Sequence, residues 1–273
     1  MGRVSYFILY LCLGLVALFQ IFPIVWLFLF SLKDNREIFA GSPFALPSEI
    51  RWQNYLTVWD GGIGLYFFNS VWITGLSIVL TILLASFATF AITRMHWKLS
   101  GLVLGLFMVG LMIPIHSALI PLFSMFLSVG LIDNPLAIVI TYTAYNLPIT
   151  MMILLGFYYT LPREIEEAAI IDGCSIHRMF FKIILPMTVP VMSTTAIINM
   201  IYNWNEFVFV NTFISSDKYR TLTVGINNFV GQYMTDWGAI GATLIISVVP
   251  ILIAFFFFSN KVVEGISSSA VKG

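Results

Sequence analysis

From Glu164 to Pro190 the chain reads EIEEAAIIDGCSIHRMFFKIILPMTVP, a charged segment between two long apolar runs. Three acidic residues stand in the first turns of a predicted short helix, where the positive end of the helix dipole favours negative charge. Gly173 is placed to end that helix in the left-handed conformation, and Ser175 can cap a second helix that runs towards Lys182. The segment therefore predicts a helix, a sharp turn and a return helix at a membrane surface.

The rest of the chain is unusually apolar. Of its 273 residues, 59% are hydrophobic and 10% are charged, and the mean hydropathy is +0.96. Soluble domains carry about 25% charged residues, so the composition indicates an integral membrane protein. The formal net charge of zero excludes the basic surface of a nucleic-acid-binding protein. The two cysteines, Cys12 and Cys174, match no metal or redox spacing.

Six segments are apolar over the roughly 20 residues that a spanning helix needs. They are residues 5–31, 66–93, 101–125, 135–160, 187–210 and 238–260. The first is too long for the apolar region of a signal peptide and is predicted to be a retained helix. Pro114 and Pro121 fall in one segment, which is therefore expected to bend.

The short loops predict the orientation of these helices. Residues 94–100 contain two basic residues and residues 126–134 contain none. Because basic residues collect in cytoplasmic loops, both termini and the loop at 161–186 are predicted to be cytoplasmic.

The charged segment has the features of a docking element. Ala168 and Ile171 lie three positions apart on one helical face, with acids beside them. An ordinary amphipathic surface helix is the alternative. The spacing of the string is more specific, because Glu166-Glu167-Ala168-Ala169 is followed by Asp172-Gly173 and then by Leu185-Pro186.

This spacing resembles the docking loop of ABC-type importer permeases. Beyond about residue 44, most of the chain is similar to permease subunits of carbohydrate-uptake importers, in particular the six-span maltose type. The matching stretches are Leu46–Ser48, Trp52–Tyr55, Phe68–Ser70, Met112–Pro114, Gly130–Asn134, Asn146–Pro148, Trp204–Phe207 and Ala270–Gly273. Two departures are Cys174, where such loops usually carry Ala, and the tail SSSAVKG, where a version containing Thr and Gly is commoner.

The resemblance implies an all-α, type I ABC importer permease fold in a prokaryotic inner or plasma membrane. It implies a first helix and outer loop (1–65), a five-helix core (66–260) and a cytoplasmic tail (261–273). The implied partners are a second homologous permease, a dimer of ABC ATPase subunits and an extracellular or periplasmic sugar-binding protein. The residues implied to couple to the ATPase are Glu166, Glu167, Ala168, Ile171, Asp172 and Gly173.

The chain is not expected to be an enzyme. The phosphate-binding pattern GxxxxGK[ST] does not occur in the sequence, so ATP and Mg²⁺ are expected on the ATPase subunits. No catalytic or metal-binding residue is predicted.

Polar side chains within spans are expensive in lipid and are therefore candidates for a substrate path. They are Asn146, Asn199, Asn203, Asn205 and Glu206. Asn199, Asn203 and Glu206 are expected on one helical face, and their amides and carboxylate, next to aromatic rings, suit a sugar. The alternatives are that Glu206 reaches water at the end of its span and that Asn146 satisfies kinked backbone.

A secondary transporter or channel and an integral membrane enzyme are the alternatives to transport driven by a partner. Many secondary transporters contain internal repeats, and none is visible in the sequence, where Glu206 is the one carboxylate available within a span. An integral membrane enzyme is disfavoured because the three histidines are scattered and neither HExxH nor GxSxG occurs.

Overall fold

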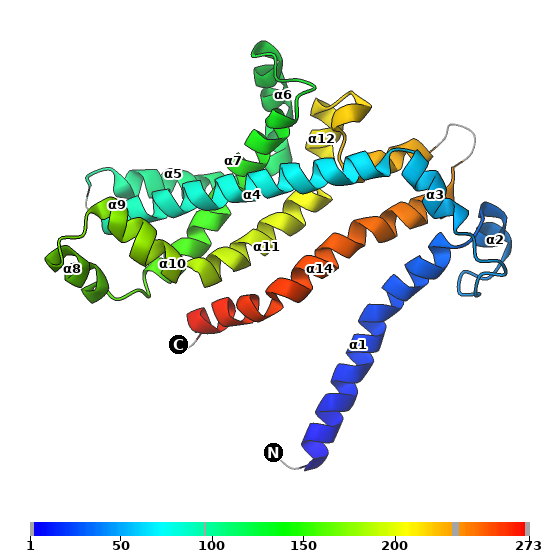
Figure 1. The fold of residues 1–273 in the computed structure, drawn as a ribbon, viewed down its shortest axis with the longest axis horizontal. Coiled ribbons are helices and arrows are strands. Elements are labelled where there is room, and N and C mark those ends of the chain that lie inside the picture. The colour runs from blue at the N-terminus through cyan, green and yellow to red at the C-terminus, as the bar shows by residue number, and fades with distance from the viewer. Residues whose placement is uncertain (1–2, 96, 231–234, 271–273) are drawn as a thin grey trace. The chain divides into compact units, whose positions relative to one another are not determined.

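The chain is mostly helical in a computed structural model that describes residues 3–95, 97–230 and 235–270 (Figure 1). Among these residues there is no β-strand, only an isolated bridge between Val230 and Thr235. The long helices are α1 (Arg3–Ser31), α4 (Ile63–Arg94), α7 (Pro135–Tyr158), α11 (Val189–Asn205) and α14 (Trp237–Ala270). His96 and the end of the predicted tail, residues 271–273, lie outside the described residues.

Shorter helices connect and extend the long ones. Before α7 they are α2 (Asn35–Ala40), α3 (Gln53–Asp60), α5 (Ser100–Met112), η1 (Ile115–Ala118) and α6 (Leu119–Ser128). Between α7 and α11 they are α8 (Glu164–Ile171), α9 (Ile176–Met179), the π-helix η2 (Phe180–Ile184) and α10 (Leu185–Met187). After α11 they are α12 (Val208–Phe213), η3 (Asp217–Tyr219), α13 (Leu222–Gly225) and η4 (Ile226–Phe229).

These helices confirm the predicted all-α membrane fold. Within the described residues, four continuous stretches, in α1, α4, α7 and α14, are long and apolar enough to cross a membrane. Two bent pairs also qualify, one formed by α5 with η1 and α6 and the other by α9–α10 with α11, and their bends are 98° and 70°. If each bent pair is one span, the count is up to six.

The bend in the third span occurs at Pro114. Ile113 and Pro114 both have ψ near 122°, which is extended backbone. Proline lacks an N–H and its ring disfavours helical backbone at the residue before it. Pro121 lies in the first turn of α6, where an N–H has no partner within the helix in any case. The predicted bend is confirmed, and Pro114 accounts for it.

The fifth span ends earlier than predicted. Helix α11 stops at Asn205, and Glu206 has extended backbone, with φ −70° and ψ 130°. The expectation that Glu206 continues the helical face of Asn199 and Asn203 is therefore wrong. The reason is local, because the Glu206 carboxylate accepts backbone N–H groups at the start of α12.

By their internal contacts the residues form two compact units. The first contains residues 1–67 and 224–250, which include α1, α2, α3 and the first part of α14. In this unit Asn35 joins the segment after α1 to the start of α14. Its Nδ2 donates to the Thr235 carbonyl oxygen (2.8 Å), and its Oδ1 accepts from the Trp237 N–H (3.0 Å).

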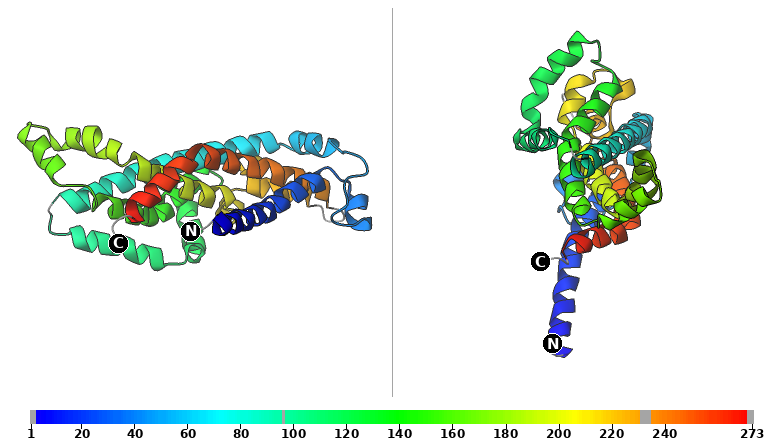
Figure 2. Two further views of the ribbon diagram at one scale, coloured as in Figure 1. Left: turned by 90° about the horizontal axis from the view of Figure 1, so that it is seen from below. Right: turned by 90° about the vertical axis from the view of Figure 1, so that its left-hand side faces the viewer.

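The second unit contains residues 68–223 and 251–273. Helices α5, α11 and α12 pack against α7. Of the apolar 18-residue stretch within α7, 61% is buried. Figures 1 and 2 show α8 beyond the ends of α4 and α7, at the extremity of this unit. The turn after α8 can therefore contact another protein, while both ends of this loop continue into the packed helices of the unit.

At the other end of this unit, Asp133 joins two loops. Its N–H donates to the Phe213 carbonyl oxygen (2.8 Å), and its carboxylate accepts the N–H groups of Ser215 (3.0 Å) and Ser216 (2.9 Å). The hydrogen bonds from Ser216 and Ser215 hold the pKa of Asp133 below its ordinary value despite some burial. These three hydrogen bonds fix the loop before α7 against the end of α12, and Asp133 takes a φ of +59° there.

Candidate functional site

The loop between α7 and α11 has the conformation that the sequence predicts. Helix α8 ends before Gly173, which adopts a φ of +73°. The Cys174 N–H donates to the Ala169 carbonyl oxygen at 2.9 Å, the bond expected after a helix that ends in a left-handed glycine. The Ser175 side chain accepts the Arg178 N–H at 3.4 Å and caps α9. The helix, turn and return helix are therefore confirmed.

The end of α8 exposes apolar side chains. Ile170 is 63% exposed and Ile171 is 85% exposed. Ala168 is exposed as well, with the Glu167 and Asp172 carboxylates beside it. We call these five residues the tip of the loop. Exposed apolar residues rimmed by charge commonly mark a protein contact, so the tip has the chemistry of a docking surface.

Of the six residues predicted to couple to a partner, Glu166 is the one that points inward. Its Oε1 lies 2.9 Å from Arg94 Nε, and the side chains of Glu166 and Arg94 are 13% and 7% exposed. Arg94 Nη2 also donates to the carbonyl oxygens of Tyr158 (2.8 Å) and Leu161 (3.1 Å). Burial raises the pKa of the Glu166 carboxyl, and Arg94 and Arg163 oppose part of this shift.

Sequence reasoning did not identify Arg94 as part of this site. In the sequence Arg94 is one of two basic residues in a short loop, which is the usual signal for orientation. Its carbonyl partners lie 64 and 67 positions further along the chain. No local pattern connects such distant residues, so the pairing became visible only in the folded chain.

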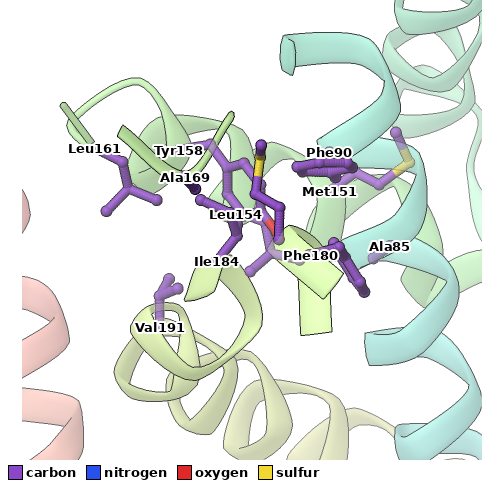
Figure 3. Close-up of a cluster of buried hydrophobic side chains, with 11 residues drawn as sticks. Ala85, Phe90, Met151, Leu154, Tyr158, Leu161, Ala169, Phe180, Ile184 and Val191 are labelled. Carbon is purple, nitrogen blue, oxygen red and sulfur yellow. The ribbon is translucent and has the colours of Figure 1, made fainter. Parts of the chain in front are cut away.

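A buried apolar cluster lies beneath this loop (Figure 3). Its residues come from α4, α7, α8, the return helix and α11. The ring of Phe180 in η2 lies with its centroid 4.9 Å from that of Phe87 and 5.1 Å from that of Phe90, both in α4. Ala169 is 6% exposed and belongs to the same cluster. The loop therefore has a packed base and an exposed tip.

Most of the predicted substrate-path residues meet between α7 and α11. Asn146 Nδ2 donates to Asn203 Oδ1 at 2.7 Å, and the Tyr145 hydroxyl donates to the same oxygen at 2.9 Å. Asn199 Nδ2 donates to Thr150 Oγ1 at 3.0 Å. We call these five residues the polar seam. Its three asparagines are at most 3% exposed, and Asn203 Nδ2 has no hydrogen-bond partner among the described residues.

Glu206 lies at one end of the seam. Its carboxylate accepts the Phe209 N–H (2.9 Å), the Val210 N–H (3.4 Å) and the Tyr142 hydroxyl (3.2 Å). His116 Nε2 lies 3.7 Å from Glu206 Oε1, and the Glu206 side chain is only 7% exposed. The alternative that Glu206 simply reaches water does not fit this burial.

Asn205 is not brought together with the other path residues. It is exposed, and its Nδ2 donates to the Ile201 carbonyl oxygen at 2.8 Å, within its own helix. The five predicted residues therefore separate into a buried group of four and one surface residue.

A hollow of about 660 Å³ opens beside the seam. Its walls come mainly from α5, η1, α6 and α7, with one residue each from α11 and α12, and most of its lining is aliphatic. The polar groups that reach it include Tyr145, Asn146 and Tyr202. Small-molecule sites are commonly hollows of this size with an apolar lining and a few polar groups. Among the described residues, no three His, Cys, Asp or Glu side chains gather as a metal site would require.

Comparison with known families gives an independent view of the chain. Residues 77–266 match the family described as binding-protein-dependent transport system inner membrane component. A probable ABC transporter permease protein, YurM of Bacillus subtilis, is 36% identical over 264 residues, which cover 97% of this chain and 87% of the relative. Over most of its length the chain thus aligns with a transporter subunit.

Further relatives carry names that specify a substrate. The trehalose/maltose transport system permease protein MalG of Thermococcus litoralis is 32% identical, over 95% of this chain and 94% of the relative. The diacetylchitobiose uptake system permease protein NgcG of Streptomyces coelicolor is 34% identical, over 92% and 84%. In fold, the chain matches a solved bacterial ABC transporter involved in alginate import with a TM-score of 0.81 and 18% identity, over 94% of this chain and 96% of that one.

Proposed function

The chain belongs to the family of binding-protein-dependent transport system inner membrane components, and we propose that it carries a sugar or a short oligosaccharide through an ATP-driven ABC importer. It is a multi-pass permease subunit in this family. The proposed partners are a second permease, a dimer of ATPase subunits that bind ATP and Mg²⁺, and a sugar-binding protein outside the membrane. Transport proceeds by alternating access as the ATPase dimer closes and opens.

The observation that carries the coupling proposal is the loop with α8. It ends in an exposed apolar tip, with Ile171 at 85% exposure, on a base that is buried and ion-paired. A docking element needs both features, because a rigid element transmits displacement and an apolar surface favours binding. We assign contact with the ATPase to Glu167, Ala168, Ile171 and Asp172, with Gly173 shaping the turn. Glu166 points away from this surface and contributes to coupling through its ion pair with Arg94, which holds the base of the loop.

The polar seam and the hollow support a sugar as the substrate. A sugar presents hydroxyl groups at its edge and C–H groups on its faces, which match amide groups and aromatic rings respectively. Asn146 and the Tyr145 and Tyr202 rings reach the hollow. Asn203 accepts hydrogen bonds from Asn146 and Tyr145, and its own Nδ2 has no hydrogen-bond partner among the described residues. No lysine or arginine is among the described residues that line the hollow, which favours an uncharged sugar. Asn199 lies at one end of the polar seam and Glu206 lies at the other.

The test is uptake by proteoliposomes that contain this chain, its permease partner, the ATPase and the binding protein. Uptake of radiolabelled sugar is expected to require ATP inside the vesicle. Ala168→Glu places a bulky charge on the tip and is expected to abolish uptake while the protein still inserts. The matched control is Lys98→Glu, which adds a carboxylate in the exposed loop between α4 and α5, and it is expected to retain uptake.

A secondary transporter would behave differently. Uptake that continues without the ATPase and stops when the proton gradient is dissipated would contradict the proposal. The buried Glu206 next to His116, 3.7 Å away, would then be the first residues to examine as a proton site.

A further inference from the structure

We propose that Arg94 is a positioning residue that fastens α8 to the ends of α4 and α7, so that the three move as one body when a partner displaces the tip. This inference rests on the proposed function, because it describes how movement of the tip would reach the spanning helices. The chain itself links α8 to α7 through residues 159–163 and to α11 through α9, η2 and α10. It provides no such nearby link to α4, so movement of the tip reaches α4 only through side-chain contacts.

The first part of the argument is the geometry of Arg94. It is the last residue of α4, and its guanidinium contacts three acceptors on two other segments. These are the Glu166 carboxylate of α8, the carbonyl oxygen of Tyr158, which is the last residue of α7, and that of Leu161 three residues later. Carbonyl groups in the last turn of a helix lack partners within it and attract cations. The planar fork of arginine suits this task, whereas the single ammonium of lysine cannot reproduce it.

The second part is burial. Arg94 and Glu166 are 7% and 13% exposed, so each charge depends on the other for compensation. Removal of one partner from a buried ion pair leaves an uncompensated charge and is much more costly than the loss of a surface pair. A swing of α8 away from α4 would carry the same penalty. The pair therefore resists separation of the two helices during the cycle.

The third part is a second attachment on the same face of α4. Phe87, Phe90 and Arg94 are spaced at i, i+3 and i+7, which places them on one side of the helix. The two rings hold Phe180 of the return helix at centroid distances of 4.9 and 5.1 Å, whereas Arg94 holds Glu166 of α8. Both limbs of the loop are thus fixed to α4, one by an ion pair and the other by aromatic packing.

The experiment measures the coupling ratio, which is the number of sugar molecules taken up per ATP hydrolysed, in proteoliposomes with the complete complex. Arg94→Met is expected to lower this ratio by about tenfold, a typical size for coupling between sites, while the ATPase still copurifies. Arg94→Lys is expected to give an intermediate ratio. The matched control, Lys98→Met, removes an exposed positive charge four residues away and is expected to leave the ratio unchanged.

Glu166→Gln provides a second measurement if Arg94→Met fails to assemble. Glutamine keeps the shape and a hydrogen-bonding oxygen but removes the charge, so the complex is expected to assemble with a reduced coupling ratio. The inference is overturned if Glu166→Gln couples as well as the wild type, or if assembled Arg94→Met does. If the wild type itself shows no ATP-dependent uptake, the proposed function fails instead, and the two failures are therefore distinguishable.

Discussion

Asn203 is the residue on which the polar seam depends. Its Oδ1 accepts both the Asn146 amide and the Tyr145 hydroxyl. Asn203→Ala would leave the buried Asn146 amide and the part-buried Tyr145 hydroxyl without this acceptor, and an unpaired buried donor costs about 1–3 kcal/mol. We expect a lower melting temperature of the purified complex and reduced uptake.

Asn205 provides the matched control for this substitution. Asn205→Ala removes the same amide two positions away, but from an exposed side chain, and we expect a change within about 0.5 kcal/mol. Equal destabilisation by the two substitutions would show that the hydrogen bonds of the polar seam add no stability beyond that of an exposed amide.

Individual site residues differ in how far the sequence could reveal them. Gly173 and Ser175 were predictable, because their roles depend on hydrogen bonds to residues within a few positions. Arg94 was not predictable, since its role depends on residues more than 60 positions away. Glu206 was named as a path residue for its polarity, but its function at the start of α12 depends on where α11 ends. Short-range sequence patterns therefore predict helix caps and turns, but they do not predict which distant residues contact one another.

Among the elements, the bent pair of α5 and α6 allows a direct test of whether proline causes the bend. The 98° bend shapes the hollow, because Gly110 and Ile115 on its two sides both line it. Pro114→Ala restores an N–H and frees Ile113 to become helical, which favours a continuous helix by about 3 kcal/mol. We expect partial straightening and weaker uptake.

Spin labels at Leu102 and Leu127, both exposed, would report this change in a background without native cysteines. In a straight helix 25 residues span about 37 Å, and we expect the distance to lengthen towards this value. Pro121→Ala is the control, because Pro121 lies in the first turn of α6, and it should leave the distance unchanged. A distance that stays the same in Pro114→Ala would show that packing, not proline, maintains the bend.

Helices were the most predictable elements. All six apolar segments correspond to helices or bent helix pairs, because about 20 consecutive apolar residues are sufficient evidence of a span. Their ends and interruptions were less predictable. The end of α11 at Asn205 and the π-helix η2 depend on capping and packing contacts that a hydropathy pattern does not contain.

For the molecule as a whole, the orientation in the membrane is the property on which the coupling proposal depends. The basic residues of the short loops predict that the loop with α8 lies in the cytoplasm, which is where ATP is available. The segment between α1 and α4 is then outside. This prediction uses charge alone and is independent of the family likeness, so a test of orientation is also an independent test of the mechanism.

Single cysteines at two exposed positions can decide the orientation, after Cys12 and Cys174 have been replaced. Ser42→Cys lies between α1 and α4, and Ile171→Cys lies at the tip of the loop. A membrane-impermeant thiol reagent added to intact cells is expected to label Ser42→Cys and not Ile171→Cys, and inverted vesicles should give the opposite result. If both positions react from outside, the tip cannot reach a cytoplasmic ATPase, and neither the docking of α8 nor the positioning role of Arg94 could stand.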